Sequence, residues 1–160
     1  MRGLRPVDRV LLPLARGVVA GAVGTAAMTL SQAIEQRASG RPGSTTPVDG
    51  VATVTGITPA DQAAQNRLNV AAHWAYGTAW GLARSALDLA GARGPAATAL
   101  HLLGVVGTEQ ALTPALGLGR PTPAYGATAT LTDLGHHVVY AAAAGTAYDA
   151  LAGDPAAGWR

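Results

Sequence analysis

The sequence contains no cysteine, no lysine and no phenylalanine. Without cysteine the chain has no disulfide, no thiolate nucleophile and no cysteine-based metal or iron–sulfur centre. Charged residues make up 12% of the chain, about half the usual share for a soluble domain. All eleven basic residues are arginine, and they stand singly along the chain. A nucleic-acid interface would gather them on one face, so no nucleic-acid partner is expected.

Long apolar segments make up much of the chain. The 160 residues are enough for one domain, and 49% of them are hydrophobic. The composition and the spacing of the apolar segments predict an all-α fold, a four-helix transmembrane bundle spanning 1–160. We expect the helices at about 12–36, 59–90, 95–117 and 124–151. The loop between the first two is expected to be partly helical, with a short helix near 47–55 and the next long helix starting at Pro59.

Two other interpretations of the apolar segments stay open. The mean hydropathy of +0.22 is low for a polytopic membrane protein, so a soluble, alanine-rich helical bundle is the alternative. A basic start before Val10 also fits a secretory signal peptide, but Arg16 would lie within its apolar core. If four spans form, the arginines outside them favour both termini in the cytoplasm and a multi-pass location in the inner (plasma) membrane.

Small residues at helical spacing predict close helix packing. Gly17 and Gly21 lie four residues apart on the first expected helix, as do Gly77 and Gly81 on the second. Such faces let two helices approach closely in lipid. They are also the motivation for a homo-oligomer or a larger membrane complex. At the end of the second helix, Arg84 and Asp88 are expected to form a surface ion pair.

Ionisable residues within the apolar segments are the candidate functional residues, because such groups are expensive at membrane depth and must be compensated. On the fourth helix Asp133 and His137 share a face, so the carboxylate is expected to fix the tautomer of the imidazole. Glu109 and His73 are expected at similar depth, and an unpaired Glu109 would be protonated. Together these four form the candidate intramembrane polar site. The second-layer candidates are His101, His136 and Tyr140, and His136 is expected on a different face from His137.

The chain carries no recognised catalytic motif. The serine-hydrolase elbow, the phosphate-binding loop and the paired-histidine zinc motif are all absent, so no catalytic residue is assigned and the protein is not expected to be an enzyme. No two histidines have metal-ligand spacing, and no metal or cofactor is assigned. A haem held by His101 and one of His136 or His137 remains an alternative without specific support.

Three stretches together resemble a known group of proteins. They are GVVAGAVGTAAM at 17–28, HWAYGTAWG at 73–81, and LTPALG at 112–117 leading to DLGHHVVY at 133–140. The combination resembles a bacterial family of small polytopic inner-membrane proteins and is loosely similar to the YagU-type proteins, which are associated with acid resistance. The resemblance implies an inner-membrane location and supplies no catalytic residues.

The leading hypothesis is a non-enzymatic integral membrane protein, in contact with the lipid bilayer, whose polar site serves proton or small-solute passage or a pH response. The first alternative is a structural partner in a membrane complex. The second is a haem- or metal-binding membrane protein.

Overall fold

The computed structural model describes residues 7–153, and it is helical throughout, with no strand in that part of the chain. The elements are α1 (Asp8–Ser39), α2 (Thr46–Thr55), α3 (Gln62–Leu89), α4 (Gly94–Ala115), the 3-10 helix η1 (Thr122–Tyr125) and α5 (Ala127–Ala152). The all-α prediction is therefore confirmed. Arg2, Arg5 and Arg160, which contributed to the predicted orientation of the termini, lie outside the described residues.

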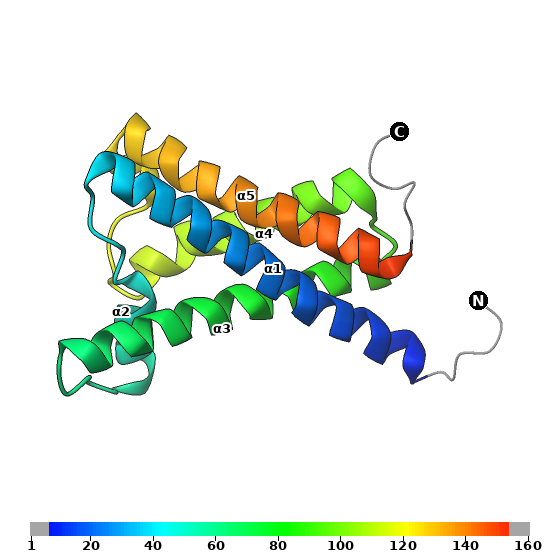
Figure 1. Ribbon diagram of the computed structural model, residues 1–160, viewed down its shortest axis with the longest axis horizontal. Helices are drawn as coiled ribbons and strands as arrows, with labels where there is room; N and C mark the ends of the chain where they lie inside the picture. Colours follow the sequence, from blue (N-terminus) through cyan, green and yellow to red (C-terminus); the bar gives the residue numbers. More distant parts are fainter. Residues whose placement is uncertain (1–6, 154–160) are drawn as a thin grey trace.

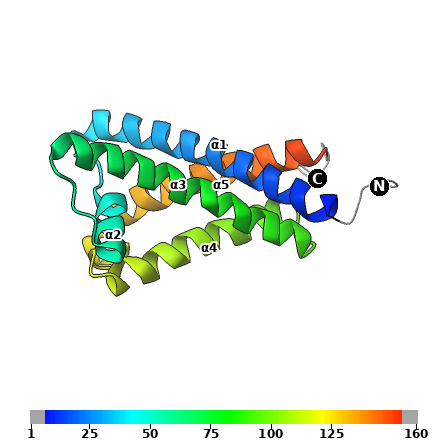
Figure 2. The same cartoon turned by 90° about the horizontal axis from the view of Figure 1, so that it is seen from below.

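Helix α1 packs against both α3 and α5 (Figure 1). On the far side of this layer α4 packs on α5 and diverges from α3 (Figure 2). The short helix α2 packs on α3 at the end where the helices diverge most. A Cβ on Gly50 of α2 would touch Leu118, in the loop after α4. Thus α2 closes the wide end of the bundle.

Glycines set the approach of α1 to α3. A Cβ added at Gly81 would overlap the Gly17 carbonyl, and one added at Gly21 would overlap the Thr78 carbonyl. One turn further along, a Cβ at Gly77 would overlap the Thr25 hydroxyl. The two small-residue faces therefore contact each other within this chain. They bring the α1 and α3 backbones closer than any side chain would permit.

The start of α3 differs from the sequence expectation. The helix begins at Gln62 instead of Pro59, because Asp61 is its N-cap and not a residue of its first turn. The Asp61 backbone is extended, and its carboxylate accepts a hydrogen bond from the Ala64 N–H at 2.7 Å. A carboxylate cap satisfies an amide that the helix leaves without a partner, which favours starting the helix there.

The bundle buries several polar side chains and exposes many large apolar ones. The buried polar residues are Thr25, Arg84, Ser85, His101, His136 and His137, while the buried hydrophobic residues are mostly alanine and tyrosine. Large apolar side chains are exposed on all four long helices, among them Val18, Val19, Val23, Leu30 and Ile34 on α1, Val70 and Leu82 on α3, Leu100, Leu103 and Leu112 on α4, and Leu131, Leu134, Val138 and Leu151 on α5. A soluble bundle usually turns its leucine and valine side chains toward the core.

By length and apolarity, α1 can cross a membrane. Its most apolar stretch has a mean hydropathy of 1.6, and it is the one helix among residues 7–153 that reaches this level over a sufficient length. Of the four membrane spans expected from the sequence, one, α1, is therefore long and apolar enough by this measure.

We predict that Gly81→Ala lowers the free energy of unfolding by about 1–3 kcal/mol, because the added methyl meets backbone that cannot rotate away. The matched control is Gly107→Ala on α4, where a Cβ meets nothing within 4 Å. This control should be neutral or stabilising by up to about 1 kcal/mol. Thermal unfolding in mild detergent measures both, and equal midpoints for the two variants would contradict the close crossing.

Candidate functional site

Three of the four expected site residues converge between α4 and α5. Glu109 of α4 lies opposite Asp133 and His137 of α5. Each of the three side chains has a carboxylate oxygen or an imidazole nitrogen within 4.8 Å of those of the other two. His137 Nε2 is 3.7 Å from Glu109 Oε2, and His137 Nδ1 is 3.5 Å from Asp133 Oδ1. We call these three residues the carboxylate–imidazole cluster. It gathers two acids and one imidazole in a small volume.

The backbone of α5 fixes the tautomer of His137. Its Nδ1 lies 3.0 Å from the Asp133 carbonyl oxygen, one turn back along the helix. A carbonyl can only accept, so Nδ1 carries the proton in the neutral ring and Nε2 keeps its lone pair. From the sequence, the carboxylate of Asp133 is expected to fix the tautomer of the His137 ring. The carbonyl does so, while the carboxylate lies 0.5 Å further from the same nitrogen (3.5 against 3.0 Å).

Glu109 is positioned by its neighbour on α4. The Gln110 side-chain amide donates to Glu109 Oε2 at 3.3 Å and to the Thr122 hydroxyl at 3.0 Å, while its carbonyl accepts from the Thr122 N–H at 2.8 Å. Gln110 therefore ties the end of α4 to η1 and aligns the carboxyl group of Glu109. The Glu109 and Asp133 side chains are 29% and 26% exposed, so the cluster is open on one side.

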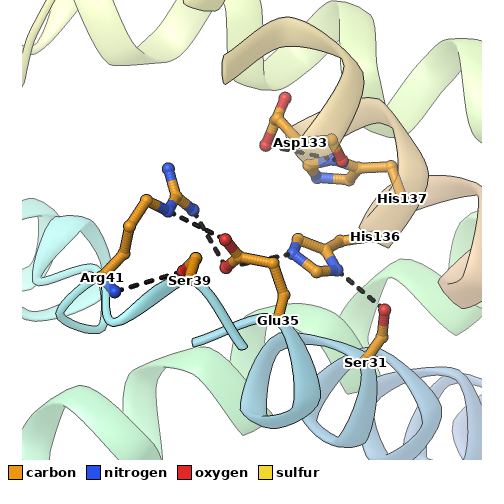
Figure 3. Close-up of polar contacts among 7 residues, drawn as sticks. All are labelled: Ser31, Glu35, Ser39, Arg41, Asp133, His136 and His137. Atoms are coloured by element: carbon orange, nitrogen blue, oxygen red, sulfur yellow. Dashed lines mark hydrogen bonds and ion pairs between the residues drawn. The ribbon is translucent and has the colours of Figure 1, made fainter. Parts of the chain in front are cut away.

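His136 faces α1 and lies outside the cluster (Figure 3). Its Nδ1 is 2.8 Å from the Ser31 hydroxyl, and its Nε2 is 4.0 Å from Glu35. Glu35 in turn accepts two hydrogen bonds from the Arg41 guanidinium, at 3.0 and 3.2 Å. His136 thus links α5 to the end of α1 and lies on a different face from His137, as its place on the helix indicates.

The remaining candidates lie elsewhere in the bundle. His73 contacts the Thr29 hydroxyl of α1 at 3.2 Å and does not join the carboxylate–imidazole cluster. Tyr140 donates to the Gly77 carbonyl at 2.6 Å, and its ring stacks near His101. His101 donates from Nε2 to the Trp80 carbonyl and borders an apolar groove of about 300 Å³ between α3 and α4. These three residues connect helices and do not form a second layer with the cluster.

The prediction of a surface ion pair between Arg84 and Asp88 is wrong. Arg84 is fully buried and pairs with Asp149 of α5 at 2.5 Å, with its guanidinium 4.3 Å from the centre of the Tyr148 ring. Asp88 pairs instead with Arg93 at 3.1 Å and accepts from the Tyr148 hydroxyl. Helix α5 approaches α3 here, so the tertiary partner of Arg84 replaces the local one. Neither Asp149 nor Tyr148 is among the candidates named from the sequence, although Asp149 is an ionisable residue inside the fourth expected helix, 124–151.

No protein-family model, no curated protein and no solved structure matches this chain. The chemistry of the site must therefore be inferred from its own geometry. The carboxylate–imidazole cluster brings two carboxylates and one imidazole nitrogen within 4.8 Å of one another, a set of ligand atoms that can hold a cation. Nothing in the cluster resembles a nucleophile activated by a base.

We predict that Asp149→Ala lowers the free energy of unfolding by about 3–5 kcal/mol, because it leaves the buried Arg84 without a counter-charge. The matched control is Arg41→Gln, which breaks the exposed pair with Glu35 and should cost about 1 kcal/mol or less. Thermal or denaturant unfolding of the two variants measures the difference. Similar losses in both would show that Arg84 is solvated in the folded protein.

Proposed function

We propose that the protein is a multi-pass integral membrane protein in which α1, α3, α4 and α5 cross the bilayer and the carboxylate–imidazole cluster serves the passage of a small cation. One observation carries the proposal. Two carboxylates meet an imidazole lone pair between helices whose outer surfaces are apolar. A positive ion is the solute that such a group of acceptors attracts.

The membrane part of the proposal is supported by the distribution of polarity. Only 33% of the apolar stretch of α1 is buried within the chain, which is less than expected for the core helix of a soluble bundle. The other long helices also expose leucine and valine along their outer faces. Water would not favour this surface, whereas hydrocarbon would. The buried His136, Ser85, Thr25 and Arg84 each have a partner inside the bundle, as a lipid environment favours, while Arg84 Nε and Nη1 have none.

The passage part is supported by the place of the cluster. It lies toward the end of the bundle that α2 and η1 close, and its carboxyl groups are partly exposed there. An ion can therefore reach the acids from that side. The assembly interpretation loses its motivation, because Gly17, Gly21, Gly77 and Gly81 are occupied by the contact between α1 and α3.

We predict opposite labelling of consecutive loops. Because the chain has no cysteine, single-cysteine variants need no background substitution. Thr53→Cys and Ala124→Cys should react with an impermeant maleimide from the outer side of the cell membrane, and Ala90→Cys only after permeabilisation. All three positions are exposed. Equal labelling of the three in intact cells, or recovery of the protein in the soluble fraction, would contradict four spans.

We predict that Glu109→Gln reduces cation flux by about tenfold or more, because it removes one of the two acids that attract the ion. Proteoliposomes holding the purified protein are tested against protons, Na⁺, K⁺ and Mn²⁺ with ion-selective dyes. Glu35→Gln is the matched control, since Glu35 pairs with Arg41 and lies outside the cluster. Fluxes in wild type equal to those in empty liposomes would refute the passage function.

A further inference from the structure

We propose that the carboxylate–imidazole cluster is a binding site for a divalent first-row transition-metal ion, with Glu109, Asp133 and His137 as its protein ligands. The inference rests on the proposed function and names the class of cation. It begins from the buried imidazole of His137. This residue is 7% exposed, and its Nε2 is the nitrogen that stays available once Nδ1 donates to the Asp133 carbonyl.

His137 Nε2 faces the carboxyl group of Glu109. It lies 3.7 Å from Glu109 Oε2, which is too long for a hydrogen bond and short enough for an ion pair when the ring is protonated. With the ring neutral, a metal ion between the two atoms would bind both of them in place of that proton. Two ligand atoms about 2.1 Å from one ion in tetrahedral geometry lie about 3.4 Å apart. The observed separation needs to close by only a few tenths of an ångström.

The surroundings of His137 have the arrangement found around metal-bound histidines. Such a ring donates its other N–H to a carbonyl or a carboxylate, which fixes the tautomer and the ring plane. The Nδ1–H of His137 donates to the Asp133 carbonyl at 3.0 Å. The carboxyl group of Glu109 is likewise held by the Gln110 amide. Two of the three ligands are therefore oriented before an ion arrives.

The ligand set selects the class of ion. One imidazole and two carboxylates suit Zn²⁺, Co²⁺ or Mn²⁺, since imidazole binds transition metals well and a cysteine-free site offers nothing to softer ions. Mg²⁺ and Ca²⁺ prefer six or more oxygen ligands, which this cluster does not supply. Three protein ligands leave a fourth position open, and the partly exposed carboxyl groups give the ion a route in.

Cobalt(II) chloride added to the purified, chelator-treated protein in detergent tests the site. Wild type is expected to bind one Co²⁺ with the visible absorption of four-coordinate cobalt, to release it to ZnCl₂, and to keep it in excess MgCl₂. Glu109→Gln, Asp133→Asn and His137→Gln should each weaken binding by more than about tenfold, since changes in supporting residues alone have effects of 10–100-fold. Glu35→Gln and His136→Gln, which alter the neighbouring contact with α1, should bind as wild type does.

The outcomes separate this inference from the proposed function. If wild type keeps its helical circular dichroism and binds no Co²⁺, or if the three ligand variants bind it as wild type does, the metal site is refuted. The passage function then still stands if flux of Na⁺, K⁺ or protons depends on Glu109. Stoichiometric Co²⁺ binding lost in the ligand variants, with no flux of any cation in proteoliposomes, would support the metal site and refute passage.

Discussion

The glycine contact between α1 and α3 is the constraint on which the rest of the bundle depends. At the crossing the backbones are so close that a single methyl group at Gly81 would overlap the Gly17 carbonyl. This approach lets Ser85 on α3 donate to the Pro13 carbonyl of α1 at 2.7 Å, and it places His73 beside Thr29. Close backbone packing gains dispersion contacts that do not depend on water, which suits a bundle with apolar outer surfaces.

Helix α5 completes the core through contacts of the same kind. Tyr140 packs on Gly24 of α1, where a Cβ would lie 2.8 Å from its ring, and its hydroxyl reaches the Gly77 carbonyl of α3. One side chain thereby joins three helices. The buried pair of Arg84 and Asp149 fixes the same three-helix core at one end. The carboxylate–imidazole cluster lies toward the other end, where Gln110, next to Glu109, is bonded to Thr122 of η1, and its carboxyl groups are partly exposed there.

The sequence predicts the features that depend on local spacing. Helical composition and apolar length indicate the all-α fold, and the four-residue spacing places Asp133 and His137 on one face of α5. It does not predict choices between partners. Arg84 has an acid four residues away at Asp88, yet it pairs with Asp149, 65 residues along the chain. His73 could serve as a site ligand by residue type, but its ring contacts the Thr29 hydroxyl of α1 instead. Such choices are decided by which helices cross, and periodicity carries no information about that.

The interior of the bundle explains why so few charges are needed. Apart from the carboxylate–imidazole cluster, most of the buried polar residues bond a neighbouring helix: Ser85 bonds α1, His136 bonds Ser31 and Arg84 bonds Asp149. Thr25 bonds the Gly21 carbonyl of its own helix. Each such bond gains strength where water is excluded, and each would be weak on a wet surface. In the cluster, by contrast, Glu109 and His137 approach to 3.7 Å without a hydrogen bond, and both carboxyl groups of the cluster are partly exposed. A proton on His137 makes this contact an ion pair, and a metal ion bound there would take the place of that proton.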